Sequence, residues 1–127
     1  MKSQTFIARA SRVTAIALLA ATVSACAFQN KYEKEADKIT HAVMNNDLAP
    51  IKNDLAPGLN ITRVQIAAAS DELSAQGKLI SVKEHQPCDA GPGWHCFDVK
   101  FEKHNYTERL SMDDQGKVTH WNFHMAN

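Results

Sequence analysis

The residue types best suited to chemistry lie between positions 85 and 96. Cys88 and Cys96 are eight positions apart and flank a Gly/Pro-rich stretch, and His85 and His95 stand beside them. The two thiols could form a disulfide, or the four side chains together could coordinate a metal ion tetrahedrally. Because this order of His and Cys is not a familiar zinc spacing, and because exported thiols oxidise, we expect a disulfide between Cys88 and Cys96.

A second histidine pair, His120 and His124, lies near the carboxyl end of the sequence. On a strand, residues four apart share a face but stand about 13 Å apart, so these imidazoles cannot hold one ion without help from another strand. We interpret them as part of a polar outer face. No nucleophile–base arrangement, phosphate-binding glycine loop or cofactor motif is evident, so we predict no catalytic residue, bound metal or cofactor.

Export is predicted by residues 1–25, which have the three parts of a secretory signal peptide. Lys2, Arg9 and Arg12 precede an apolar run from Val13 to Val23, and small residues follow it. The run is too short to span a bilayer, which takes about 20 apolar residues. We therefore predict that this segment is removed, which leaves about 100 residues for one domain with a modest core.

The end of this segment, Val23-Ser24-Ala25-Cys26, resembles the bacterial lipobox. The resemblance implies a diacylglyceryl group on the Cys26 thiol, cleavage before that residue, and a short lipidated tether over 26–30. Two or three acyl chains make desorption from a membrane negligible. Ala27 after the cysteine implies, by the enterobacterial sorting rule, the outer membrane with the domain facing the periplasm. The alternative is ordinary cleavage, which would release a soluble protein.

The charge of the chain after residue 25 argues against polyanionic partners. The signal segment contains three of the 14 basic residues and none of the 14 acidic ones, so 11 Lys and Arg remain against 14 Asp and Glu. The formal net charge is then three negative, with no basic cluster. Nucleic acid and anionic lipid head groups are poor partners for such a surface.

Helical periodicity dominates the first half of the predicted domain, which covers residues 31–127. Apolar residues from Tyr32 to Val43 recur at spacings of four, three and four, which predicts a helix over about 31–46. A short helical turn follows, and its expected inward residues are Leu48, Ile51 and Leu55.

A second helix is predicted over 62–76 by local signals at both of its ends. Thr62 can cap its start while Gln65 reaches back, and Gly77 can end it in the left-handed conformation. Its expected buried residues are Ile66, Ala69, Ser70 and Leu73.

After Gly77 the apolar period changes from 3.6 to 2, which predicts four antiparallel strands. The predicted strands are 79–84, 94–103, 106–112 and 118–125. A two-residue loop at His104-Asn105 would set Val99 opposite Leu110 and Phe97 opposite Met112.

The last strand can turn either of two faces inward. Strict pairing around a loop of Asp114 to Gly116 would align Met112 with Val118 and turn the histidine face inward. A one-residue adjustment brings Trp121 and Phe123 inward, and we predict this register because burial of the apolar set decides it.

These elements, together with the closing stretch Leu110-Ser-Met-Asp-Asp-Gln-Gly-Lys-Val-Thr-His-Trp-Asn-Phe123, resemble the small cystatin-like domains related to nuclear transport factor 2. They are similar in particular to a bacterial group of unknown function with an Asp-x-x-Gly-Lys-Ile turn before the last strand. The resemblance covers about residues 31–125. It implies an α+β fold with N-terminal helices packed on one face of a four-stranded antiparallel meander, around a cone-shaped pocket. The chain departs from the isomerase members, since it has no recognisable Tyr plus acidic pair, and we expect no buried acidic residue.

We therefore expect a domain that binds a molecule without converting it. The ligand could be a small apolar molecule in the cone, with Phe101, Tyr106 and Trp121 as lining, or an envelope protein could dock on the exposed strand face. The alternative is an isomerase or lyase of the same fold that uses His120 or Asp98 as a base. An acid or base deep in an open apolar pocket would favour that alternative.

Overall fold

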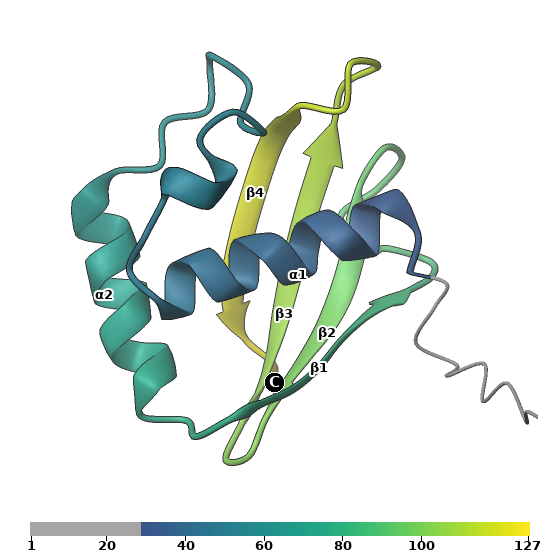
Figure 1. The fold of residues 1–127 in the computed structure, drawn as a ribbon. Coiled ribbons are helices and arrows are strands. Elements are labelled where there is room, and N and C mark those ends of the chain that lie inside the picture. The colour runs from purple at the N-terminus through teal and green to yellow at the C-terminus, as the bar shows by residue number, and fades with distance from the viewer. Residues whose placement is uncertain (1–28) are drawn as a thin grey trace, which may run out of the picture.

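The computed structural model of this chain describes residues 29–127. Cys26 and the predicted signal peptide lie outside these residues. The elements in order are α1 (Lys31–Met44), η2 (Ala49–Ile51), α2 (Arg63–Ser74), β1 (Leu79–His85), β2 (His95–Phe101), β3 (Asn105–Met112) and β4 (Val118–Met125). The strands form one antiparallel sheet in the order β1-β2-β3-β4, so the α+β class with a four-stranded meander is confirmed (Figure 1). None of the helices between residues 29 and 127 has the length and apolarity needed to cross a bilayer.

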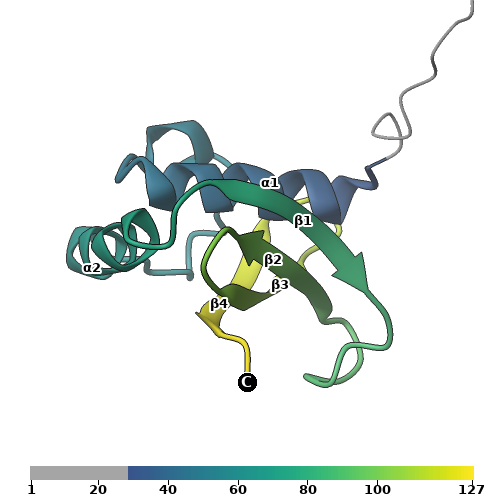
Figure 2. The same ribbon diagram turned by 90° about the horizontal axis from the view of Figure 1, so that it is seen from below.

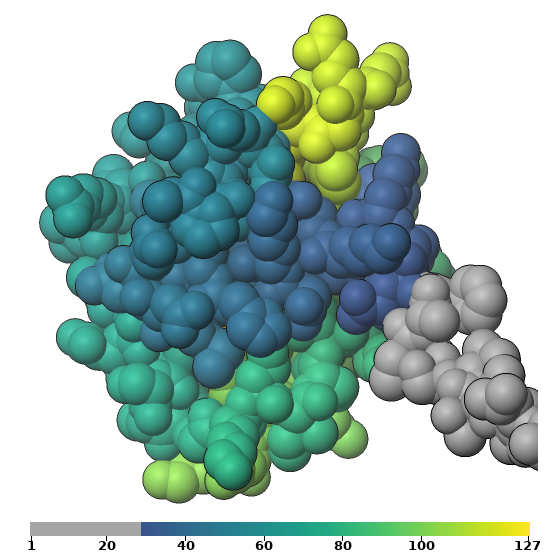
Figure 3. Space-filling model, in the orientation of Figure 1, coloured from purple at the N-terminus to yellow at the C-terminus, as the bar shows by residue number. Residues whose placement is uncertain are grey.

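Helix α1 lies across one face of the sheet (Figures 1 and 2). Its predicted apolar stripe is buried, because Ala36, Ile39 and Val43 are at most 1% exposed and belong to one core cluster with residues of β1 to β4. The side chains of α1 run through the middle of this face in Figure 3. The helix begins at the cap Asn30, whose side chain accepts from the Glu33 amide and donates to Glu84 Oε2 at 2.8 Å. The start of α1 is therefore tied to β1.

The segment between the helices folds inward as predicted. Ile51 of η2 is fully buried, and Leu48 and Leu55 pack against the core cluster. The chain then touches the start of β4, where the Val118 amide donates to the Asp54 carbonyl and the Ala56 amide donates to the Val118 carbonyl, both at 2.8 Å. These bonds cover only the first residue of that edge strand.

Helix α2 begins with the predicted capping box. The Gln65 amide donates to Thr62 Oγ1 at 3.2 Å, and the Thr62 amide donates to Gln65 Oε1 at 3.0 Å. Ser70 Oγ donates to the Met44 carbonyl at 3.1 Å, which joins α2 to the end of α1. In Figure 1, α2 stands beside the β4 side of the sheet. A cavity lies between α2 and β4 and is lined by residues of both elements.

The predicted register of the β2–β3 hairpin is wrong by four residues. Val99 pairs with Tyr106, in place of Leu110, and Phe97 pairs with Glu108, in place of Met112. The turn lies two residues earlier than predicted, because the Phe101 amide donates to the His104 carbonyl and Glu102 and Lys103 form the loop. The loop bonds to the chain at the end of α2: the Lys103 amide donates to the Gln76 carbonyl and the Glu102 amide to the Lys78 carbonyl. A shift of four residues leaves every side chain on its predicted face.

The β3–β4 pairing has the predicted one-residue adjustment. Met112 pairs with Val118, the register shifts at Ser111/Met112, and Leu110 then pairs with Trp121. Trp121 and Phe123 pack against the core cluster, so the prediction that they face inward is confirmed. The bulge sets the indole of Trp121 beside the residues of β3 that α1 covers.

Candidate functional site

The most promising site for a ligand is the space between α2 and β4. A cavity of about 570 Å³ opens there, which we name the β4 cavity. Its apolar lining includes Leu59, Ile61 and Leu73 on the helix side and Trp121 and Phe123 on the strand side. Cavities of this size accept small organic molecules.

Two of the three residues predicted to line a pocket reach this cavity. Tyr106 and Trp121 are among its lining residues, whereas Phe101 is not. Phe101 is 3% exposed and packs edge-on against Tyr106, with ring centroids 5.6 Å apart. Phe101 therefore packs behind Tyr106, on the side away from the cavity. This position follows from the β2–β3 register, which sets Tyr106 opposite Val99.

A buried carboxyl lies behind the same wall, contrary to our expectation of none. Glu108 of β3 is fully buried. Thr40 Oγ1 of α1 donates to Glu108 Oε2, and Trp121 Nε1 of β4 donates to Glu108 Oε1, both at 2.8 Å. Burial raises the pKa of Glu108 to about 8, although these two bonds favour the charged form.

The sequence contained a signal for this residue. Glu108 alternates with Tyr106 and Leu110 on β3, and both of these neighbours face the core. Two-residue alternation alone places the carboxyl inside. Its role is to join α1, β3 and β4, because each carboxylate oxygen accepts from a different element. Glu108 is not among the residues that line the β4 cavity, and it meets that cavity only through Trp121.

A second acidic residue lines the β4 cavity itself. Glu72 of α2 lines the β4 cavity and accepts a hydrogen bond from the Tyr106 hydroxyl at 3.0 Å. Burial, with the neighbouring Glu72 carboxylate, raises the pKa of Tyr106 to about 12, so the phenol stays a donor at neutral pH. This bond links the exposed Glu72 of α2 to the buried Tyr106 of β3. The sequence predicts no role for Glu72, which is one acidic residue on the exposed face of the predicted helix.

Another acidic group lies where α1 meets the segment after η2. Lys38 pairs with Asp54, and Glu35 lies beside them. Burial and the charge of Asp54 raise the pKa of Glu35 to about 7. One oxygen of Glu35 is buried without a hydrogen-bond partner among the described residues. Lys38 lines a cavity whose described lining residues include no phenylalanine, tyrosine or tryptophan, so we interpret the group as part of the contact between α1 and the segment after η2.

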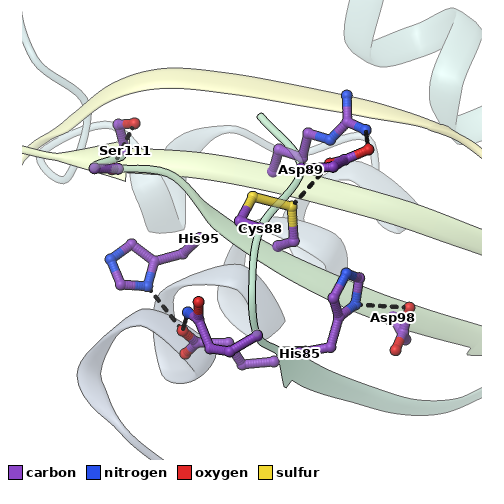
Figure 4. Close-up of a disulfide and its surroundings, with 11 residues drawn as sticks. His85, Cys88, Asp89, His95, Asp98 and Ser111 are labelled. Carbon is purple, nitrogen blue, oxygen red and sulfur yellow. Dashed lines mark hydrogen bonds and ion pairs between the residues drawn. A yellow bond between two sulfur atoms is a disulfide. The ribbon is translucent and has the colours of Figure 1, made fainter. Parts of the chain in front are cut away.

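The predicted cysteine pair is joined. The sulfur atoms of Cys88 and Cys96 are 2.04 Å apart in a disulfide bond, so neither is a thiolate free to bind a metal (Figure 4). The loop lies on the sheet face opposite α1, where Asp89 accepts from Arg109 Nη2 at 2.7 Å and Ser111 Oγ donates to the Gly93 carbonyl at 3.0 Å. The disulfide loop therefore covers part of the outer face.

The histidines proposed as metal ligands or bases are separated from one another. His85 Nδ1 lies 3.0 Å from Asp98 Oδ1 and His95 Nδ1 lies 2.8 Å from Glu84 Oε1, so the two imidazoles point to different carboxylates (Figure 4). Asp98 and His120 are exposed on the outer face and line no part of the β4 cavity. His124 differs from our expectation, because it reaches the rim of that cavity from the edge strand.

A neighbouring cavity of the same volume lies on the other side of the segment that contains Leu59 and Ile61, which line both. It is bordered by residues between 46 and 66 and includes the charged residues Asp47, Lys52 and Arg63. It has no aromatic lining residue and no link to the Glu108 bonds, so the β4 cavity is the stronger candidate.

Comparison of the chain with protein-family models, with curated proteins and with solved structures gives no match.

Proposed function

We propose that this chain is a lipid-anchored protein of the bacterial cell envelope whose domain binds a small, mainly apolar molecule in the β4 cavity. The observation that carries the proposal is the cavity itself: about 570 Å³, with aliphatic side chains on α2 and its preceding loop and aromatic side chains on β4. Ligand sites in proteins are typically apolar hollows of this size with a few placed polar groups. Here Glu72 and the Tyr106 hydroxyl are two of those groups, and they are joined by a hydrogen bond.

Binding is favoured over catalysis by the position of the strongest acid–base candidate. An isomerase or lyase would need a base whose free oxygen or nitrogen reaches the ligand. Glu108 has the raised pKa that such a role requires, but both its oxygens accept bonds from Thr40 and Trp121 and the side chain does not line the cavity. A group held in this way supports the wall and is not placed to abstract a proton from a ligand.

The arrangement of helix and sheet also supports the resemblance to cystatin-like domains. A long first helix across a four-stranded meander, with a cavity beside it, is the arrangement that the resemblance implies. We propose that the β4 cavity takes the place of the cone-shaped pocket of that fold.

The proposed anchor would hold the cavity close to a membrane. Asn30 is already fixed to β1 through Glu84, so the folded domain begins four residues after Cys26. Four residues span at most about 14 Å. With Ala27 after the lipidated cysteine, we propose the periplasmic side of the outer membrane as the location.

A cavity-filling variant tests the proposed binding. Ala69 lines the cavity from α2, whereas its neighbour Ala68 is exposed. We expect the neutral apolar dye N-phenyl-1-naphthylamine to bind the full chain carrying Cys26→Ser, which needs no detergent. Ala69→Phe should weaken this binding at least tenfold because the ring occupies the cavity, while Ala68→Phe, the matched control, should not change it. Circular dichroism establishes that both variants are folded. Equal dye affinity in the two variants, or no dye binding at all, would contradict the proposal.

A further inference from the structure

The charged side chain that lines the β4 cavity is acidic. Glu72 is the cavity's only carboxylate, and the described lining residues include no lysine and no arginine. His124 lies at the rim of the cavity. An anionic ligand would therefore enter beside a like charge, which disfavours it.

Only one of the two carboxylate oxygens of Glu72 accepts a hydrogen bond from a described side chain. Its Oε1 accepts from the Tyr106 hydroxyl, and among residues 29–127 no side chain donates to its Oε2. Tyr106 is 1% exposed, so its position is fixed by the core. Glu72 thus offers one oxygen to a donor that enters the cavity, and the phenol holds the carboxylate in place.

Aromatic rings run from this carboxylate along the strand side of the cavity. The rings of Tyr106 and Phe123 stack with centroids 5.1 Å apart, and Phe123 and Trp121 follow at 6.2 Å with an interplanar angle of 25°. Aromatic faces attract organic cations through the negative charge on the ring face. Trp121 is further held by Glu108 at 2.8 Å, so this wall is organised before a ligand arrives.

From this geometry we propose that the ligand of the β4 cavity is an organic cation with an apolar body, such as a hydrophobic amine or quaternary ammonium compound. Its charged group lies beside Glu72 and its apolar part lies against Phe123 and Trp121. The inference rests on the proposed function, since it names the class of ligand for the same cavity. Fatty acids and other anionic amphiphiles are the class that it excludes.

Three ten-carbon probes that differ only in their head group test this inference. Decyltrimethylammonium, decanoate and decanol are titrated, below the concentrations at which they aggregate, into the full chain carrying Cys26→Ser. The chain has two tryptophans, and Trp94→Phe leaves Trp121 as the sole reporter in the cavity wall. At pH 7.5 we expect the cation to bind at least tenfold more tightly than decanoate, because of the charge of Glu72.

Glu72→Gln is the decisive variant, because its amide oxygen can still accept from Tyr106 while the charge is gone. We expect it to reduce the preference for the cation to less than threefold and to leave decanol binding unchanged. Asp71→Asn removes a neighbouring exposed charge that does not line the cavity and should keep the full preference. Equal binding of the three probes, or a preference that Glu72→Gln does not change, overturns the inference and leaves the cavity as a binding site. If no probe alters Trp121 fluorescence, the proposed function itself is overturned.

Discussion

The buried Glu108 gives a sharp test of the physical reasoning, through the variant Glu108→Gln. Glutamine has nearly the same shape, its carbonyl oxygen can accept from Trp121, and its amide can donate to Thr40. The variant therefore keeps the bonds that join α1, β3 and β4 while it removes the proton equilibrium. We expect it to fold, and to differ from the wild type mainly in how its stability depends on pH.

The sign and size of the effect follow from the pKa of Glu108. Burial in the folded chain raises the pKa of Glu108 from its ordinary value of 4.5 to about 8, so between these pH values the folded chain holds a proton that the unfolded chain has lost. The stability linked to this proton is fully present below about pH 4.5, falls as the pH rises, and is lost above about pH 8. The slope is about 1.4 kcal/mol of unfolding free energy per pH unit. A pH of 7 is about 2.5 units above the pKa of the carboxyl in the unfolded chain, so keeping Glu108 protonated in the folded chain costs up to about 3 kcal/mol. Glu108→Gln removes this cost and should stabilise the fold by the same amount.

Urea unfolding at pH 5, 6, 7 and 8 with the disulfide intact measures these quantities. The unfolding free energy of the wild type should fall relative to that of Glu108→Gln as the pH rises across this range. Glu102→Gln is the matched control, because it makes the same chemical change at an exposed position of the β2–β3 turn. Parallel curves for wild type and Glu108→Gln would refute the reasoning, since they would show that folding does not change the proton affinity of Glu108.

Three further predictions concern the disulfide, the α2 cap and the anchor. Replacing both Cys88 and Cys96 by Ser should lower the unfolding free energy by about 2 to 3 kcal/mol, because the bond closes a loop of about nine residues in the unfolded chain; an unchanged urea midpoint would contradict this. Thr62→Ala should lower it by about 1 kcal/mol through loss of the cap, whereas Thr62→Ser should retain most of the stability. Cys26→Ser should move the protein from the membrane to the soluble fraction of the envelope, and membrane association that survives this substitution would rule out the lipid anchor.

Local sequence signals were sufficient to predict the helices and strands and the faces that they bury. Thr62 and Gln65 form the capping box at the start of α2, as the sequence predicts. The alternation on β4, together with the bulge at Ser111/Met112, turns Trp121 inward. Such features depend on residues that are close in sequence or directly across a hairpin. The same alternation, applied to Glu108, would have placed a carboxyl in the core.

The location and lining of the candidate site depend on the tertiary structure. The β2–β3 register depends on amides of the turn that donate to the carbonyls of Gln76 and Lys78, which no local pattern reveals. The position of α2 beside β4 leaves the cavity open, and only that position brings Glu72 to the hydroxyl of Tyr106, 34 residues away. Periodicity determines which side of an element faces the core. Contacts between distant elements determine where that element lies, because they depend on the packing of the whole domain.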